Sequence, residues 1–594
     1  MSYRRKKLLA LFFAMALSMT AVAGCTGIKS STGNVVSSET ETNAEETSAQ
    51  SEAGTFSSVD MFTERDLAGT YEESGAVYVT LSDDDITGET DGVVIDGQMV
   101  TITAEGTYIF SGTLSEGQIV VDADNAKVQI VFDNVDITCA SSAAVYVKSA
   151  EKVFVTLAEG SQNTLRNTDE YVAIDDNNID AVIFAKSDLT LNGTGSLTII
   201  SAEGHGIVSK DDLKIIGGTY DITAAGHALS GKDSVRIADG TFILTAEKDG
   251  IHAENADDEE KGYIYIADGD FTITSDGDGM DASNIVQIED GTLDITAGGG
   301  SANSLKTHES DVPGGPGGGM PQNGEKLDGE SMPQMGEKPD GENMPQDTTT
   351  DESGTSTKGI KAGGGMYLNG GTYQIDSADD SIHSNANITI ADGTYTLATG
   401  DDGVHADDAL IVNGGTITVT ESYEGLEGLA VTINDGTIDI TASDDGINTA
   451  GEKMELNGGY IHILAGGDGV DSNGDLTING GEIYIDGPSD NGNSAIDYGD
   501  RSSAYVNGGT LVAIGSSGMA EVMSDSSKQK VLMVKLGEQM EAGNVVLTDS
   551  EGNVIVSYTA LKTYDCVIIS TAEVESGATY TLTTSGTTTE VTAE

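Results

Sequence analysis

The stretch that decides the fold is residues 393–406, "GTYTLATGDDGVHA". Its first half alternates polar and apolar residues, which is typical of a β-strand with one buried face. Its second half places two adjacent carboxylates, Asp401 and Asp402, between glycines, although adjacent like charges repel. The pattern indicates a strand followed by a tight acidic turn, and its meaning depends on how often the chain repeats it.

The same unit recurs along the chain with a period in the low twenties. Each repeat holds two or three short strands rich in β-branched residues, separated by Gly, Asn and Asp at turns, and helical periodicity is nearly absent. This predicts an all-β, right-handed single-stranded parallel β-helix, whose coils stack about 4.8 Å apart. Leucine-rich repeats share the period, but their Leu/Asn consensus is missing. The units begin at Gly195, Gly218, Gly240, Gly269, Gly291, Gly371, Gly393, Gly415, Gly436, Gly459, Gly481 and Gly509.

Departures from the repeat divide the chain into regions. Residues 70–190 keep the strand pattern with looser spacing and predict an N-terminal cap and the first coils, whereas residues 191–527 predict the regular β-helix. Residues 528–594 resemble conventional antiparallel strands and predict a small C-terminal β cap. One coil is interrupted by residues 309–357, rich in Gly, Pro and Met, which predict a disordered insertion. This insertion is either a tolerated surface loop or a partner-binding arm.

The N-terminus has the pattern of an export signal. Residues 1–25 combine a basic head, an apolar run and small residues before Cys25. The final Val-Ala-Gly-Cys resembles the bacterial lipobox, which implies lipidation of Cys25, although a plain secretory signal is the alternative. Residues 26–69 then predict a disordered tether. We therefore expect an exported protein, lipid-anchored to the outer face of the bacterial cell membrane.

The charge of the chain excludes some partners. With 98 acidic against 28 basic residues, the formal net charge is -70. Binding to nucleic acid or directly to an anionic membrane needs Lys and Arg to replace counterions, so we expect no nucleic-acid partner and membrane contact only through the lipid anchor on Cys25. Such an excess of carboxylates favours bound divalent cations.

Aligning the acidic turns places their polar residues in two columns. In a parallel coil equivalent residues are near neighbours, so carboxylates of one column repel by roughly 1 kcal/mol per pair even in water. The first column contains His205, His227, Asp249, Asp278, Asn303, Asp380, Asp402, Glu424, Asp445 and Asp468. The second column contains Val208, Ser230, His252, Asp281, Lys306, Lys361, His383, His405, Glu427, Asn448, Asp471 and Asp497.

Clustered carboxylates beside glycines supply the oxygen ligands of Ca²⁺, which accepts roughly six to eight oxygens in flexible geometry. Mg²⁺ fits less well, because it takes few protein ligands in strict octahedral geometry. For Zn²⁺, His252, His383 and His405 share a column, but we expect no cysteine or close His pair to complete a site. The alternative is that the acids only form turns and keep the protein soluble. The predicted Ca²⁺ ligands are Asp276, Asp278, Asp281, Asp379, Asp380, Asp401, Asp402, Asp444, Asp445, Asp468 and Asp471.

The lipobox, the Gly-Gly-Thr coil, the turns "DDGVH" and "DGVDS" and the Gly/Pro/Met insertion together resemble the clostridial carbohydrate-binding parallel β-helix proteins. The resemblance is clearest over residues 190–500. It implies a pectate-lyase-like solenoid that binds calcium through clustered aspartates and recognises cellulose or acidic plant polysaccharides such as polygalacturonate. The metal ligands that it implies here are Asp249, Asp276, Asp278, Asp281, Asp401, Asp402, Asp444, Asp445, Asp468 and Asp471.

Three functions remain open, of which the sequence favours calcium-dependent polysaccharide binding. Ca²⁺ would bridge carboxylates of the protein and of an acidic glycan, or cellulose would stack on tyrosines. A pectate-type lyase would need a lysine of lowered pKa as its base; the candidates are Lys306 and Lys361, and Lys248 is weaker. A surface adhesin or scaffold would instead bind a protein through residues 309–357.

Overall fold

Strands dominate the computed structural model of this chain. The structure describes residues 56–306 and 356–593, apart from residues 89, 174, 452 and 500. The predicted export signal with Cys25 and nearly all of the predicted insertion lie outside the described residues. Within the described part of the chain, no helix is long and apolar enough to cross a membrane.

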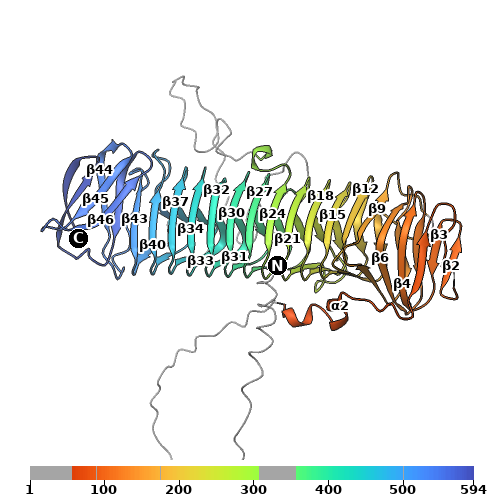
Figure 1. The fold of residues 1–594 in the computed structure, drawn as a ribbon. Helices are drawn as coiled ribbons and strands as arrows, with labels where there is room; N and C mark the ends of the chain where they lie inside the picture. The colour runs from red at the N-terminus through yellow and green to blue at the C-terminus, as the bar shows by residue number, and fades with distance from the viewer. Residues whose placement is uncertain are drawn as a thin grey trace, which may run out of the picture. The chain divides into compact units, whose positions relative to one another are not determined.

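Each regular coil consists of three strands, which pair in parallel with those of the next coil (Figure 1). In one coil β15 (Thr219–Ala224) is followed by β16 (Leu229–Gly231) and β17 (Ser234–Ile237). They pair in register with β18, β19 and β20 of the following coil. This pattern of three parallel sheets repeats along the stack, so the predicted parallel β-helix is confirmed.

The three sheets of the helix, numbered by their order within a coil, contain most of the strands. The first comprises β9 (Gln162–Asn167), β12 (Ser196–Ser201), β15, β18 (Thr241–Ala246), β21 (Asp270–Ser275), β24 (Thr292–Ala297), β27 (Thr372–Ser377), β30 (Thr394–Thr399), β32 (Thr416–Glu421), β34 (Thr437–Ala442), β37 (Tyr460–Ala465), β40 (Glu482–Asp486) and β43 (Thr510–Gly515). The second comprises β3 (Met99–Ile102), β5 (Gln118–Asp122), β7 (Val145–Ser149), β10 (Ala181–Ala185), β13 (His205–Ser209), β16, β19 (Ile251–Ala253), β22 (Met280–Ala282), β25 (Ile360–Ala362), β28 (Ile382–Ser384), β31 (Val404–Val412), β33 (Leu426–Ile433), β35 (Ile447–Thr449), β38 (Val470–Ser472) and β41 (Ile496–Tyr498). The third comprises β1 (Val77–Leu81), β4 (Gly106–Leu114), β6 (Lys127–Thr138), β8 (Lys152–Leu157), β11 (Asp188–Gly193), β14 (Asp212–Ile215), β17, β20 (Tyr263–Ile266), β23 (Val286–Ile288), β26 (Met366–Leu368), β29 (Ile388–Ile390), the ends of β31 and β33, β36 (Met454–Leu456), β39 (Leu476–Ile478) and β42 (Ala504–Val506).

The core lies inside the coils, where like residues stack on like. Strands of the first sheet alternate exposed and buried positions, as in β15 and β18, because successive side chains point to opposite faces. The in-register pairing stacks the rings of Tyr220, Phe242 and Phe271 in succession, with centroids 5.3 and 4.7 Å apart. The buried side of each strand therefore builds a continuous apolar column, in which each fully buried large side chain contributes about 1.5–3 kcal/mol.

The glycine that opens each first-sheet strand has a steric reason. Gly415 adopts φ +88°, and a Cβ at this position would lie 2.8 Å from the carbonyl oxygen of Gly393 in the preceding coil. Any other residue would therefore be strained by its own backbone and would also press on the neighbouring coil. This explains why the repeat keeps glycine at that turn.

The stack continues in register across the predicted insertion. β22 pairs with β25, and β24 pairs with β27, although the paired strands are far apart in sequence. The short 3₁₀ turn η2 (Ser301–Asn303) leads towards the insertion from β24. The insertion thus leaves from one coil and returns to complete it, as the repeat spacing predicts.

The prediction that residues 26–69 form a disordered tether is wrong for their last part. α2 (Glu64–Ala68), which follows η1 (Ser58–Asp60), lies against β11 of the solenoid and is fixed by a capping box between Thr63 and Asp66. Asp66 is fully buried and pairs with Lys152 at 2.6 Å. The ring of Phe56 lies 4.3 Å from that of Tyr263. These contacts with the third sheet order the end of the segment, although its composition predicts disorder.

Antiparallel strands close both ends of the described helix. At the N-terminal end β2 (Val93–Asp96) pairs with β3. At the other end β44 (Leu532–Met540) and β47 (Tyr564–Ser570) continue the first sheet after β43. A separate antiparallel sheet contains β45 (Gly543–Thr548), β46 (Val554–Ala560), β48 (Thr579–Thr584) and β49 (Thr587–Thr592). These additions cover strand edges that would otherwise be open to pairing with other chains.

Candidate metal centre on the acidic edge

The turns between the first and second sheets form one edge of the solenoid, which we call the acidic edge; it runs from His205 to Asp497. The second column predicted from the sequence is present, since consecutive members pair in register from Ser230 through His252 and Asp281 to Lys361. The register then continues without a break through His383, His405, Glu427, Asn448 and Asp471 to Asp497.

Two predicted column positions are wrong. Lys358, after the insertion, stands in the first column where the sequence alignment placed Asn303, and its N–H donates to Asp278 Oδ1 at 2.7 Å. Lys306 stands outside the second column and reaches the edge from the N-terminal side of the insertion. These positions could not be predicted from the repeat, because spacing does not show whether the residues before or after the insertion complete the coil.

First-column residues have a structural task that the sequence analysis did not foresee. The six aspartates of this column each accept an N–H from the next coil at Oδ1, for example Asp249 from Asp278 at 2.9 Å and Asp402 from Glu424 at 3.1 Å. Turn N–H groups that do not join the ladders need such partners. The sequence signal for this role is the acid that recurs just before the turn glycine. The bond to the N–H occupies one oxygen of the carboxylate and leaves the other oxygen for a cation.

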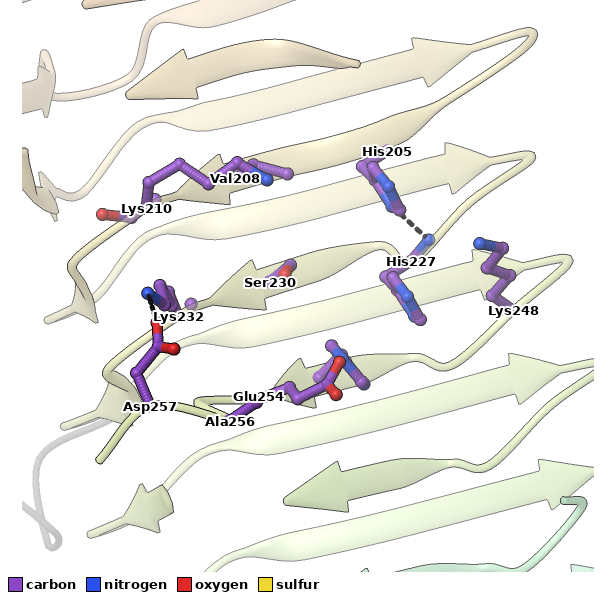
Figure 2. Close-up of a pocket in the computed structure, with 13 residues that line it drawn as sticks. His205, Val208, Lys210, His227, Ser230, Lys232, Lys248, Glu254, Ala256 and Asp257 are labelled. Atoms are coloured by element: carbon purple, nitrogen blue, oxygen red, sulfur yellow. Dashed lines mark hydrogen bonds and ion pairs between the residues drawn. The ribbon is translucent and has the colours of Figure 1, made fainter. Parts of the chain in front are cut away.

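Histidines take the same role at the N-terminal end of the edge. His205 Nδ1 accepts the N–H of His227 at 2.9 Å, and the His227 ring stacks on that of His252 at 4.1 Å (Figure 2). His227 and His252 both place Nδ1 3.0 Å from Asp249 Oδ2. The expectation of no close His pair is therefore wrong, because the two histidines come from different columns of adjacent coils.

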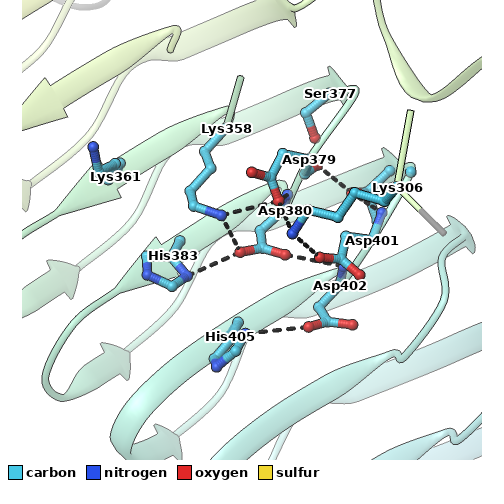
Figure 3. A network of polar contacts seen from close by, with 12 residues as sticks. Lys306, Lys358, Lys361, Ser377, Asp379, Asp380, His383, Asp401, Asp402 and His405 are labelled. Carbon is cyan, nitrogen blue, oxygen red and sulfur yellow. Dashed lines mark hydrogen bonds and ion pairs between the residues drawn. The ribbon is translucent and has the colours of Figure 1, made fainter. Parts of the chain in front are cut away.

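In the middle of the edge, lysines neutralise the acids; we call this the lysine-paired segment (Asp379, Asp380, Asp401 and Asp402, with Lys306 and Lys358) (Figure 3). Lys358 Nζ lies 2.9 Å from Asp379 Oδ1 and 2.7 Å from Asp380 Oδ2. Lys306 Nζ lies 2.8 Å from Asp379 Oδ1 and also contacts Asp401. Burial alone would lower the pKa of Lys306, but the facing carboxylates, Asp380 foremost, raise it well above its usual range.

Two histidines also face these acids. His383 Nδ1 lies 2.9 Å from Asp380 Oδ2, and His405 Nδ1 lies 3.1 Å from Asp402 Oδ2 and 3.3 Å from Glu427 Oε2. Burial opposes a charge on His405, but its bond to Asp402 and the nearby carboxylates raise its pKa to about 10. His405 is thus a cation at neutral pH, and among the described residues it is the last basic member of the two columns.

Farther along the edge lie five aspartates, which we call the bare acid segment: Asp444, Asp445, Asp468, Asp471 and Asp497. Among the described residues, no Lys, Arg or His pairs with any of them. Oxygens of Asp445, Asp468 and Asp471 lie within 4.8 Å of one another. Burial and mutual repulsion raise the pKa to about 8 for Asp445, about 7 for Asp468 and about 6 for Asp471.

The bare acid segment fits a hard cation. A Cβ on Gly467 would lie 2.2 Å from Asp444 Oδ1 and 2.5 Å from Asp445 Oδ1, so the glycine keeps open the space onto which these oxygens converge. Asp468 is 8% exposed, and its carboxylate accepts the N–H of Ser494 at Oδ1. An all-oxygen donor set of several carboxylates is the one that Ca²⁺ prefers.

The predicted metal ligands differ in whether a basic side chain pairs with them. The bare acid segment contains four of them, Asp444, Asp445, Asp468 and Asp471. Asp276 is exposed beside a hollow of about 370 Å³ that Asp379 and Lys306 also line. Those with a basic partner are Asp249, Asp278, Asp281, Asp379, Asp380, Asp401 and Asp402.

Comparisons with known proteins agree on one family. A family model described as carbohydrate-binding domain-containing protein matches residues 96–403 and 401–551. A protein of the same description from Acetivibrio thermocellus is 41% identical over 135 residues, 22% of this chain and 47% of the relative, so the match spans about half of its length. A solved structure described as a polysaccharide lyase-like protein from C. thermocellum, gadolinium derivative, is 36% identical, with TM-score 0.37, over 38% of this chain and 92% of that chain. Because the family model matches most of this chain, the chain belongs to the carbohydrate-binding domain-containing protein family.

Proposed function

We propose that the protein binds acidic polysaccharide through calcium held by the bare acid segment. The observation that carries the proposal is the cluster of Asp445, Asp468 and Asp471, whose oxygens lie within 4.8 Å of one another without a basic partner among the described residues. Membership in a carbohydrate-binding family supports a polysaccharide as the partner. Calcium matters because a polyanion would otherwise be repelled by a chain of net charge -70.

The residues that would hold the ion are Asp444, Asp445, Asp468 and Asp471, with Asp497 beside them. Asp445 and Asp468 each give one oxygen to a backbone N–H of the next coil, which fixes the carboxylate and leaves the other oxygen for a ligand. Bound calcium would supply positive charge that attracts a uronate carboxylate. The acids themselves orient the ion at the surface of the edge, where a long glycan has access.

A pectate-type lyase is the second candidate, and the geometry of the two proposed bases opposes it. Burial alone would lower the pKa of Lys361, but Asp278 and Asp281 raise it, and Lys306 is raised in the same manner. Both lysines therefore stay protonated at neutral pH, whereas proton abstraction from a uronate needs a neutral amine. This is why we place binding ahead of elimination.

Anchoring of the protein by a lipid on Cys25 belongs to the same proposal. It would hold the solenoid at the outer face of the bacterial membrane, where a polysaccharide can be reached. Labelling of cells with a clickable fatty-acid analogue tests it: the protein should take up label, and Cys25→Ala should not. Label that persists in Cys25→Ala would contradict the anchor.

The binding proposal is tested by retention on insoluble polygalacturonate and on cellulose, with calcium and then with chelator, while absorbance of an unsaturated product is followed. We expect retention on polygalacturonate that chelator abolishes, without product. Asp445→Asn/Asp468→Asn should lose retention, and Asp221→Asn, an exposed acid on the first sheet, should keep it. Product that disappears in Lys306→Ala or Lys361→Ala would establish the lyase instead. Absence of retention on both glycans would leave the adhesin or scaffold.

A further inference from the structure

A pocket lined by basic side chains lies at the N-terminal end of the acidic edge, beside β13, β16 and β19 (Figure 2). Its volume is about 350 Å³. Such a gathering is unexpected on a chain with 28 basic and 98 acidic residues. The basic residues that line it are His205, Lys210, His227, Lys232, Lys248 and His252.

Two of the three lysines form no ion pair with a carboxylate of the described residues. Lys232 Nζ lies 2.9 Å from Asp257 Oδ2. Lys210 and Lys248 are exposed, and no carboxylate of the described residues lies within ion-pair distance of either. Lys210 Nζ instead lies 5.4 Å from the centroid of the Phe184 ring. The pocket therefore holds two ammonium groups that form no ion pair, although both interact electrostatically with Asp180.

The acids around the pocket are engaged by the histidines. Asp249 Oδ2 lies 3.0 Å from Nδ1 of both His227 and His252, and Glu254 Oε2 lies 3.4 Å from His252 Nε2. Asp249, Asp281 and Glu254 face His252, and Asp257 faces Lys232, so the field of Lys210 and Lys248 acts on Asp180 and on the histidines. Its effect is visible on His205, whose pKa falls to about 3 because of burial and of neighbouring His227, Lys248 and Lys210.

His205 presents a donor to the pocket. Its Nδ1 accepts the N–H of His227 at 2.9 Å. A neutral imidazole that accepts at Nδ1 carries its proton on Nε2, where it can donate. Together with the lysine ammonium groups, this N–H group forms a donor set that matches an oxyanion.

The geometry points to a second binding subsite: this basic pocket binds an oxyanion group of an acidic glycan, a uronate carboxylate or a sulfate ester, directly and without calcium. The assignment rests on the proposed polysaccharide binding for the molecule that carries the oxyanion. The two subsites lie on the same edge of the solenoid, one basic and one acidic. A long acidic chain lying along the edge would meet fixed ammonium groups at one end and calcium at the other.

The test is isothermal titration calorimetry of the full mature protein with trigalacturonate in low salt and EDTA. We expect binding without metal, and Lys210→Gln/Lys248→Gln should weaken it at least about tenfold, because charge-assisted bonds to the carboxylate are lost. Lys453→Gln, an exposed lysine on the third sheet, is the matched control and should bind like the wild type. Lack of binding in EDTA, or equal affinity of the double variant, would overturn the subsite.

Further titrations separate the sources of the oxyanion and the two subsites. A sulfated galactotriose tests the sulfate ester, and neutral galactotriose should not bind. Inorganic sulfate that binds as tightly as trigalacturonate would overturn the assignment to a glycan. Asp445→Asn/Asp468→Asn should keep the binding in EDTA. If that binding persists while calcium-dependent retention on polygalacturonate fails in the wild type, the calcium proposal fails and the basic subsite stands.

Discussion

The lysine-paired segment and the bare acid segment contain nearly the same sequence motif, "GDDGVH" at residues 400–405 and "SDDGIN" at residues 443–448. In the first, Asp401 contacts Lys306, and Asp402 pairs with His405 at 3.1 Å. In the second, Asp445 faces Asp468 and Asp471. An acidic doublet in a solenoid therefore has no fixed role: the neighbouring coil decides whether it receives a cation from the chain or must take one from solution.

The largest effect should come from removing the built-in cation of the lysine-paired segment. Lys358→Gln leaves buried Asp379 and Asp380 short of a partner, and loss of one member of a buried ion pair typically costs about 3–5 kcal/mol. We expect a loss of stability near the low end of this range in urea denaturation, and partial recovery on addition of calcium. A loss below about 1 kcal/mol would show that the lysine does not hold this segment together.

Calcium should stabilise the protein only through the bare acid segment. At about one hundred times the dissociation constant, binding to the folded state contributes about 2.7 kcal/mol. The wild type should therefore melt higher in calcium than in EDTA, whereas Asp445→Asn/Asp468→Asn should show little difference. A calcium effect of wild-type size in the double variant would place the ion elsewhere.

Without calcium, stability should fall as pH rises through about 6 to 8. The pKa values of Asp445, Asp468 and Asp471 are raised to about 8, 7 and 6, so the folded state holds protons that the unfolded state releases near pH 4. Their repulsion is absent at low pH and complete above the raised pKa values, at a cost on the order of 1 kcal/mol per group. Urea midpoints at pH 5 and pH 8.5 in EDTA measure this.

Replacement of the three aspartates by asparagine should flatten that pH profile. Calcium should restore more stability at pH 8.5 than at pH 5, because protons compete with the ion at the lower pH. A profile that rises between pH 6 and pH 8 in EDTA would contradict the assignment of the raised pKa values.

The smallest effect should come from filling the space at Gly467. The Cβ in Gly467→Ala would crowd Asp444 Oδ1 and Asp445 Oδ1, so the carboxylates must turn away and calcium affinity should fall about tenfold, a loss of about 1.4 kcal/mol. Gly451→Ala is the control, because its Cβ would meet only Leu429 Cδ1 at 3.4 Å. Unchanged calcium affinity in Gly467→Ala, by titration calorimetry, would mean that the carboxylates of Asp444 and Asp445 do not hold the ion.

The fold and the two columns of the acidic edge could be predicted because each coil repeats the same pattern of residues. The coils repeat a strand of alternating burial, a glycine at a tight turn and an acid next to that turn. The register of neighbouring coils therefore follows from the spacing of these residues, as the pairing of His383 with His405 shows. The docked segment could have been foreseen in part, since Thr63 and Asp66 have the spacing of a capping box.

The partners of each acid could not be predicted in the same way. Lys358 enters the first column because it returns from the insertion, and spacing does not reveal which side of an insertion completes a coil. The contact between His227 and His252 joins different columns and depends on ring orientation. The use of Asp249 and Asp402 as backbone acceptors likewise depends on where the next coil places its N–H.

The most direct test of the central claim compares the two doublets by calcium titration. Asp444→Asn/Asp445→Asn and Asp401→Asn/Asp402→Asn remove equal charge from the same position of two coils, and circular dichroism checks that both remain folded. The account predicts that the first variant loses calcium binding while the second binds like the wild type. Loss of binding in the second variant with retention in the first would contradict it.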